Sequence, residues 1–398
     1  MNTDNLSFEI VPRFYVTCLY VNSKITKSME KDFIENFKEV GFEIETISIH
    51  KIASFDYLNF TRLGYLKIEV KPQKLPSPEP SKLAKVSQAI ETLCKKYNSE
   101  EVNSIKFDIE NQPYAINIAV KVSGLGEKES DEVMWTDDVI SRYKKSIGKW
   151  IEFYSGHWPD YSEELYLSRI KNNLSNRLSE LHFIRKNSSF IYMPHSGYDA
   201  YMPYMNKFFI EQILYVRSLL LCYSLLNKEV DEVNRRFTDL KKRPIKEIEK
   251  EIEKVETLER SVQNLASHTF KERFQYRRYH SSRVLETCYN LFQIEAISPQ
   301  VEEKINKLQA ALVSERTVQQ QKLAQQQRIW ISILTVLLGS QVAFEVKDRM
   351  ITFLNIASDE PIVELIEVGL WVIMGIAVSV AIVGLVYSWF SKRYKIGK

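Results

Sequence analysis

The stretch RIWISILTVLLGSQVAFEVKD, from Arg328 to Asp348, decides how this chain is organised. It begins with the apolar density of a membrane helix, but Ser332, Thr335 and Gln341 interrupt the run. A polar residue in a membrane-spanning helix is costly unless it faces protein or water. If the stretch crosses a membrane, one side of it must therefore face a protein or aqueous interior.

A second apolar segment, VGLWVIMGIAVSVAIVGLVYSWF at 368–390, settles the topology. It is uncharged, and as a helix it would be about 34 Å long, enough for a hydrocarbon core of roughly 30 Å. If it crossed alone, the large domain without a secretion signal would lie inside and the basic tail, 391–398, outside, against the positive-inside rule. We therefore predict two spans, at 329–346 and 368–390, joined by an external loop at 347–367. Both termini are then cytoplasmic.

The polar side of the first predicted span suggests a pore. At helical spacing Ser332, Thr335 and Gly339 share a side, which would line a narrow path if several copies surrounded an axis. The external loop carries five acidic and two basic residues, which favours cations near its mouth. The alternative is a packing face whose hydroxyl groups bond neighbouring helices. The candidate pore-lining residues are Ser332, Thr335, Gly339, Ser340, Gln341 and Glu345.

Long helices are predicted before the first span. From Pro299 onward no glycine or further proline intervenes, so 299–328 predicts a stalk helix that continues into the span. Its apolar seam, Val301 to Leu312, gives way to a glutamine-rich stretch. The segment PIKEIEKEIEKVETLERSVQNL, which starts at Pro244, has near-heptad apolar spacing typical of a coiled coil. An apolar helix at about 204–237 contains Glu211 and Arg217, so we predict a buried core helix there and not a third span.

In the N-terminal third of the chain, the spacing of apolar residues alternates between that of strands and that of helices. Segments such as FEIVPRFYVTCLYV and FEIETISIH read as strands, and helices are expected at 27–40 and 82–96. We predict an α/β domain of ferredoxin-like complexity at 1–135, closed by a hairpin around Asn111, Gln112 and Pro113. The region 136–298 is expected to be helical and coiled-coil. The predicted fold class is thus α+β.

Composition excludes several function classes. The 398 residues, 44% of them hydrophobic, can build more than one unit, and a net charge of +3 argues against a protein that coats nucleic acid. The four cysteines lie far apart, as expected for reduced core residues. No nucleophile elbow, phosphate loop or zinc-ligand spacing is present, so we expect neither an enzyme nor a bound metal.

Two stretches combine cationic and aromatic residues in the way that a phosphate-and-base ligand requires. One is FKERFQYRRYHSSR at 270–283, and the other is the tyrosine-rich FIYMPHSGYDAYMPYMNKFF at 190–209, with His157 and Trp158 as further candidates. A solvated basic face and core-packing aromatic residues are the simpler interpretations. The candidate ligand-binding residues are Arg273, Arg277, Arg278, Tyr276, Tyr279, His195 and Tyr198.

The order of these parts resembles the CorA-type magnesium transporters, and the likeness covers the last ~100 residues. QQQRIWISILTVLLG looks like that family's junction of stalk and pore. The Gly-Met-Asn triplet that marks the outer end of the family's first span is replaced here by GSQVAFE, which puts magnesium selectivity in doubt. The resemblance implies a pentamer. It also implies, from divergent members in antiviral systems that include type III CRISPR loci, gating by a nucleotide messenger such as SAM-AMP.

These observations lead to one main functional hypothesis and two alternatives. The chain is expected to be a homo-oligomeric cation channel of the inner membrane, opened by a cytoplasmic ligand, with no direct nucleic-acid partner. Its partners would be its own copies and the lipid bilayer, and a divalent cation enters only as transported ion. The alternatives are a membrane-anchored coiled-coil scaffold and a divalent-metal transporter with a degenerate filter.

Overall fold

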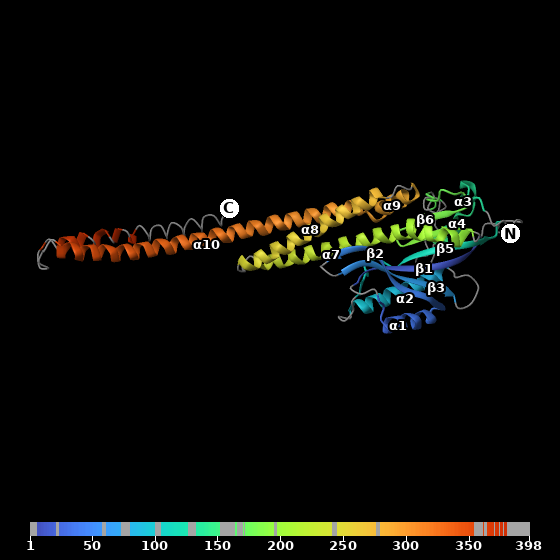
Figure 1. Cartoon of the computed structure of the whole chain (residues 1–398), viewed down its shortest axis with the longest axis horizontal. Coiled ribbons are helices and arrows are strands. Elements are labelled where there is room, and N and C mark those ends of the chain that lie inside the picture. The colour runs from blue at the N-terminus through green and yellow to red at the C-terminus, as the bar shows by residue number, and fades with distance from the viewer. Residues whose placement is uncertain are drawn as a thin grey trace. The chain divides into compact units, whose positions relative to one another are not determined.

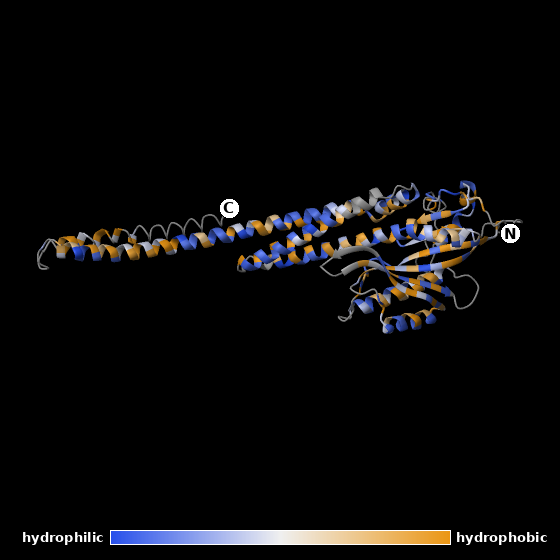
Figure 2. Cartoon of the chain, viewed as in Figure 1, coloured by the Kyte–Doolittle hydropathy of each residue, from blue (hydrophilic) through white to orange (hydrophobic). Residues whose placement is uncertain are grey.

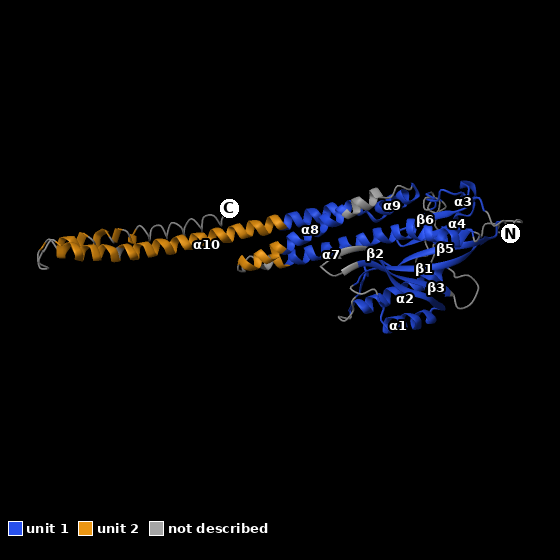
Figure 3. Cartoon of the chain, in the orientation of Figure 1, with its two compact units in different colours: residues 1–235, 254–308 blue, residues 236–253, 309–398 orange. Residues whose placement is uncertain are grey.

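The fold is described from a computed structural model, which divides into two compact units (Figure 3). The first unit comprises 1–235 and 254–308, and the second comprises 236–253 and 309–398. The structure describes residues 6–20, 24–57, 61–72, 80–99, 105–125, 133–151, 164, 170, 172–194, 197–240, 245–275, 279–353, 361, 364–369, 371–373, 375–376 and 378–379.

The first unit begins with an antiparallel sheet that contains the strands predicted from the sequence. In chain order its first elements are β1 (Ser7–Tyr20), α1 (Lys27–Glu39), β2 (Phe42–Tyr57), β3 (Thr61–Pro72), α2 (Pro80–Ser99) and β4 (Ile105–Phe107). The strands are ordered β2-β3-β1, and β4 pairs with the other side of β1. The first four strands thus have the ferredoxin-like order that the sequence predicted, within a sheet of seven strands.

The predicted hairpin between the last two strands is wrong. β4 and β5 (Tyr114–Ser123) do not pair with each other, because both pair with β1, at Cys18–Tyr20 and Ser7–Tyr15. The expectation of a wholly helical region after residue 136 is also wrong. β6 (Leu181–Ile184) and β7 (Ser188–Tyr192) extend the same sheet, and β7 lies parallel to β5. The order from one edge to the other is β2-β3-β1-β5-β7-β6.

Alternation along β1 separates the two faces of the sheet. Phe14, Val16 and Cys18 join the core under α1 and α2, which cover the same face (Figure 1). Both helices present an apolar side, and Met29, Phe33 and Phe37 of α1 are buried as predicted. The other face is polar at this point, where Arg13 forms an ion pair with Glu69 at 2.9 Å. Fully burying one such apolar side chain stabilises the fold by about 2 kcal/mol.

Helices complete the first unit. After α3 (Asp137–Arg142) and α4 (Lys144–Ile151), the elements are α6 (Tyr198–Met205), a π-helical turn η2 (Asn206–Ile210), α7 (Glu211–Leu240), α8 (Ile245–Gln275), α9 (Tyr279–Phe292) and α10 (Ile294–Phe353). The most apolar window of the helix that runs through α7 is 78% buried, which confirms a core helix there. The four cysteines are free and buried, also as predicted.

The helix α10 continues from the first unit into the second. It starts before the expected Pro299, which it contains, and it extends past Val346 to Phe353, so the first part of the predicted external loop is helical. Val301, Ile305 and Leu308 are buried, and the apolar positions of α8 are buried at heptad spacing from Ile248 to Leu265. Figure 2 shows α10 mostly hydrophilic in its middle and more hydrophobic towards its end.

Candidate functional site

A cavity of about 470 Å³ lies within the first unit. Its walls come from the turn before β6, from α6 and from the first turn of α9. This volume falls in the range of small-molecule sites in proteins. The lining residues are Asn176, Arg177, Glu180, His182, Ala200, Tyr201, Tyr204, Met205 and His280.

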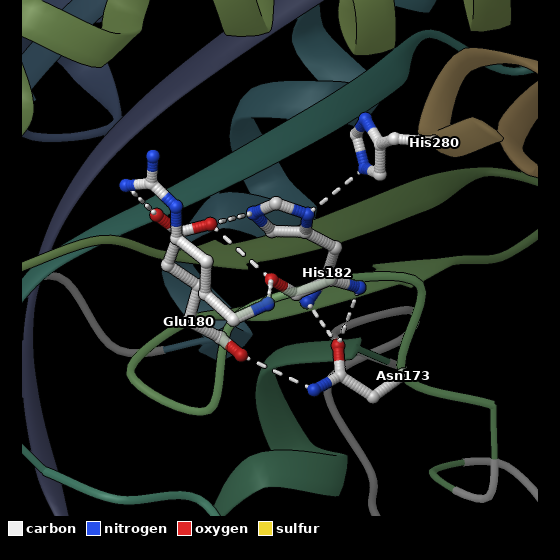
Figure 4. A network of polar contacts seen from close by, with 6 residues as sticks. Asn173, Glu180, His182 and His280 are labelled. Atoms are coloured by element: carbon white, nitrogen blue, oxygen red, sulfur yellow. Dashed lines mark hydrogen bonds and ion pairs between the residues drawn. The ribbon is translucent and has the colours of Figure 1, made fainter. Parts of the chain in front are cut away.

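Asn173 builds the wall that precedes β6. Its side-chain oxygen accepts hydrogen bonds from the backbone N–H groups of Ser175 and His182, at 3.1 and 2.8 Å. Its side-chain nitrogen donates to the carbonyl of Glu180 at 3.1 Å. An asparagine favours such local bonds to backbone, which hold a turn that has no ladder of its own. The turn thereby fixes Glu180 and His182 at the start of β6 (Figure 4).

The side chains of Glu180, His182 and His280 form a row. Nε2 of His182 lies 3.4 Å from Oε2 of Glu180, and Nδ1 of His182 lies 3.2 Å from Nε2 of His280 (Figure 4). One imidazole must donate and the other accept in this contact, which requires at least one of the two rings to be neutral. Burial lowers the pKa of His182 well below its ordinary value and lowers the pKa of His280 to about 4. Near neutral pH both rings are therefore uncharged.

Rings from three elements stack beside this row. The rings of Phe209 and His280 are nearly parallel, with centroids 6.0 Å apart and an interplanar angle of 14°. Tyr204 stacks on His280 with centroids 6.1 Å apart at 28°. Both Tyr204 and His280 line the cavity. Aromatic surfaces arranged in this way suit a planar ligand group that lies against them.

Arg177 places a cation at the cavity. Its guanidinium lies 4.0 Å from the centroid of the Tyr201 ring and 3.3 Å from Oε1 of Glu180. The Arg177 side chain is 49% exposed, so its remaining donors are accessible to an anionic group. Burial is the largest influence on Glu180 and raises the pKa of its carboxyl group. The cavity thus combines ring surfaces, neutral imidazoles and one accessible cation.

Metal binding has no support in this part of the molecule. Among the residues that the structure describes, no three His, Cys, Asp or Glu side chains are grouped so that they could hold a metal ion. In the row of Glu180, His182 and His280, His182 contacts the carboxylate with one ring nitrogen and forms a hydrogen bond with His280 through the other. This row suits hydrogen bonding or proton transfer better than chelation.

The structure joins the two stretches that the sequence proposed separately. Tyr201 and Tyr204 come from the tyrosine-rich stretch, and His280 comes from the basic one. Of the predicted ligand-binding residues, Tyr198 accepts a hydrogen bond from Arg13 at 3.3 Å, and Tyr279 is 70% exposed; neither lines the cavity. The others lie outside the described side chains: Arg273, Tyr276, Arg277, Arg278 and His195, together with His157 and Trp158.

Four cavity residues were not anticipated from the sequence. They are Asn176, Arg177, Glu180 and His182, which lie in and after a turn that reads as an ordinary polar loop. A buried histidine two positions after a glutamate at the start of a strand is the only local signal. It becomes visible once β6 is known to be a strand.

The predicted pore-lining residues do not all share one side of α10. Along an unbroken helix, each residue turns by about 100°, so Gln341 lies about 180° from Ser332 and Glu345 about 140° from it. Ser332, Thr335 and Gly339 do share a side, and the Ser340 side chain lies outside the described ones. The carboxylate of Glu345 bonds to Arg349 at 2.6 Å.

Residues after α10 pack back on it. Phe344 and Trp371 are in edge-to-face contact with ring centroids 5.5 Å apart, and Nζ of Lys347 lies 3.5 Å from Oε2 of Glu367. Two acidic residues that were expected to attract cations, Glu345 and Glu367, are therefore each paired with a basic residue. This weakens the argument that the acidic residues of the predicted external loop favour cations near the mouth of the path.

Comparison with known proteins finds no protein-family model that matches the chain and no matching curated sequence.

Proposed function

We propose that the chain is a homo-oligomeric membrane channel that opens or closes when a ligand occupies the cavity around Arg177, His182 and His280. One observation carries the membrane part of this proposal. The most apolar window of α10 has none of its residues buried, whereas that of the helix through α7 is 78% buried. Both helices are apolar enough to span a membrane. Only the helix through α7 has its apolar window covered by protein; the window of α10 is uncovered.

The uncovered apolar surface of α10 argues for lipid or for further copies of the chain. Trp330, Leu334 and Leu337 are 65%, 53% and 58% exposed. A contiguous apolar patch of this kind on a protein surface marks a membrane or protein interaction site. In an oligomer, the side of α10 that carries the Ser332 and Thr335 hydroxyl groups would contact other copies of the chain. The apolar sides of α10 would contact lipid.

The chain connection from the cavity to α10 supports ligand control. His280 lies in the first turn of α9, and α9 joins α10 through Gln293, which has a φ of 55°. A left-handed conformation at a residue other than glycine costs of order 1 kcal/mol and marks a joint that the surrounding structure holds in place. A ligand that displaces His280 would move α9, and with it the start of α10.

The ligand class that fits the cavity is a planar heterocycle with an anionic group, which includes a nucleotide messenger. The half-buried ring of Tyr204 offers a surface at the cavity, and Arg177 offers a charge. SAM-AMP, the messenger suggested by the CorA-like resemblance, is the first compound to test.

The competing readings have less support. The α8 seam that would recruit a partner in a scaffold is already buried within the chain from Ile248 to Leu265. A divalent-metal transporter would need a filter, and the chain lacks the triplet that supplies it in the family it resembles. Uptake of Mg²⁺ without any added nucleotide would favour that reading.

The test is ion flux in proteoliposomes that contain the purified full chain, with and without SAM-AMP. We expect flux with the compound, and loss of the response in Arg177→Ala and His280→Ala. The matched control is Asn172→Ala, an exposed position next to the turn and outside the cavity lining. A chain that passes no ions under either condition contradicts the channel, whereas flux unaffected by the cavity variants contradicts the ligand site alone.

A further inference from the structure

One side of α10 carries a column of small or polar residues. Positions spaced by three or four residues lie within about 40° of one line along an α-helix. Followed in both directions from Arg328, this line collects alanine, serine, threonine, glutamine, glycine and valine. We call these residues the α10 column: Ala310, Ser314, Thr317, Gln321, Ala324, Arg328, Ser332, Thr335, Gly339, Val342 and Val346.

The α10 column contains one charge, at Arg328. All the leucine, isoleucine, phenylalanine and tryptophan residues between 310 and 346 lie off the column. Such a division is expected when one side of a membrane helix approaches an axis shared with other copies and the remaining sides meet lipid or other helices. Within the column, the Ser332 and Thr335 hydroxyl groups donate to the carbonyls of Arg328 and Ile331, each at 2.8 Å.

The described residues of the returning segment, none of which lies beyond 379, contact α10 away from the α10 column. They contact α10 through Phe344 and Lys347, which lie about 160° and 100° around the helix from Arg328. The Arg328, Ser332 and Thr335 side chains are exposed, and no atom lies within 4 Å of a Cβ built on Gly339. The contacts described for the returning segment therefore lie on a different side of α10, and the exposed side chains of the column can meet further copies of the chain.

We infer that Arg328 forms a ring of positive charge at the cytoplasmic end of the conduction path and selects anions over cations. The inference rests on the proposed channel and reverses the cation preference that the sequence suggested. Arginine rings select anions in pores, and a full charge outweighs the dipoles of the uncharged column residues that follow it. The acidic residues at the other end should influence selectivity less. Glu345, for example, lies off the column and forms an ion pair with Arg349.

A simpler role for Arg328 is that of an interfacial anchor, because arginines at the cytoplasmic end of a span commonly reach the lipid headgroups. An anchor would face outward, towards lipid. Its place in the α10 column, on the side that carries the hydroxyl groups, argues for the axis. The two roles predict different neighbours for residue 328 in the oligomer.

The first experiment locates residue 328 and needs no ligand. Single cysteines replace Arg328, Ser332 or Trp330 in the full chain in membranes, where the four natural cysteines are buried. With an oxidant such as copper phenanthroline, we expect disulfide-linked dimers for Arg328→Cys and Ser332→Cys. Trp330→Cys, about 160° from Arg328, should not be cross-linked. Cross-linking at Trp330 in place of Arg328, or at none of the three, overturns the inference.

The second experiment measures charge selectivity from reversal potentials in a KCl gradient across planar bilayers, with SAM-AMP present. We expect Arg328→Gln to raise the cation-to-anion permeability ratio by roughly tenfold or more, Arg328→Glu to raise it further, and Arg328→Lys to preserve it. The matched control is Lys322→Gln, which removes one cation from the same helix about 120° away from the column.

The outcomes separate this inference from the proposed channel. A wild-type chain that conducts and whose selectivity does not change in Arg328→Gln refutes the role of Arg328 and leaves the channel standing. An equal shift in Lys322→Gln also refutes it, because the effect is then one of general surface charge. A wild-type chain that does not conduct under any tested condition overturns both.

Discussion

Nδ1 of His182 lies 3.2 Å from Nε2 of His280, in a contact between side chains 98 residues apart in the sequence. The contact ties the start of β6 to the first turn of α9. Because two protonated imidazoles would repel at this distance and lack an acceptor, it is stable only while at least one ring is neutral. The same geometry makes the cavity sensitive to acid.

The stability of the first unit should therefore fall below neutral pH. Burial lowers the pKa of His182 and of His280, the latter to about 4, from ordinary values near 6.5. The unfolded state then binds more protons, so the free energy of unfolding drops as pH falls from 6.5 towards 4, by up to about 1.4 kcal/mol per pH unit for each proton. The pKa of Glu180 is raised by burial and opposes this trend.

Thermal denaturation of the full chain in detergent between pH 7 and pH 4.5 tests this dependence. His280→Phe should flatten it, because phenylalanine keeps the stacking with Phe209 and cannot take up a proton. His50→Phe is a comparison with a smaller expected effect, because His50 is exposed on β2, although burial lowers its pKa as well. If the melting temperature of His280→Phe falls with pH as steeply as that of the wild type, protonation of His280 is not the cause of the acid sensitivity.

Loss of the Asn173 side chain should destabilise the turn that carries Glu180. Three hydrogen bonds are removed in Asn173→Ala, and two backbone N–H groups are left without their acceptor, which costs about 2–3 kcal/mol. Urea unfolding followed by tryptophan fluorescence measures this loss. Asn172→Ala, exposed and adjacent, should change stability by less than about 0.5 kcal/mol.

Local sequence patterns anticipated the elements of the fold better than their pairing. The periodicity of α1, α7, α8 and α10 is regular enough to define each helix. The hairpin expected around Gln112 failed because β4 has only three residues and finds its partner in β1, about 90 residues earlier. A turn signal does not indicate which strand a short segment will join.

The cavity was anticipated only in part for a similar reason. The aromatic and basic stretches that were singled out do contribute Tyr201, Tyr204 and His280. Their partners, Glu180 and His182, lie just before and within β6, a strand of four residues in a region that was predicted to be helical. Contacts across about 100 residues depend on the packing of β6 against α9, and no local pattern specifies that packing.

Arg217 should prove one of the least replaceable residues of the first unit. It is 2% exposed, and it donates to the carbonyls of Lys186 at 2.8 Å and Gln112 at 2.6 Å. Its guanidinium also lies 5.0 Å from the centroid of the Tyr114 ring. We expect Arg217→Met to cost about 3 kcal/mol, since the backbone carbonyls of Lys186 and Gln112 both lose a charged donor.

Arg217→Lys should recover only part of that loss, because one ammonium group cannot reproduce the planar fork that reaches both carbonyls. Arg235→Met, at an exposed position of α7, is the control. Urea midpoints of the three variants compare the effects. A midpoint for Arg217→Met equal to that of the wild type would contradict the structural role.

The contact between Phe344 and Trp371 predicts a specific disulfide. The ring centroids are 5.5 Å apart and the neighbouring Lys347 pairs with Glu367, so the two segments are antiparallel neighbours at this level. Cysteines at positions 344 and 371 should form a bond within one chain, visible as faster migration on non-reducing gels at unchanged chain mass. Trp330→Cys combined with Trp371→Cys should not, because 330 lies 14 residues, about 21 Å, further along α10. If the 344–371 pair cross-links only between chains, the hairpin is exchanged between copies, and the side of α10 that faces the oligomer axis would have to be assigned anew.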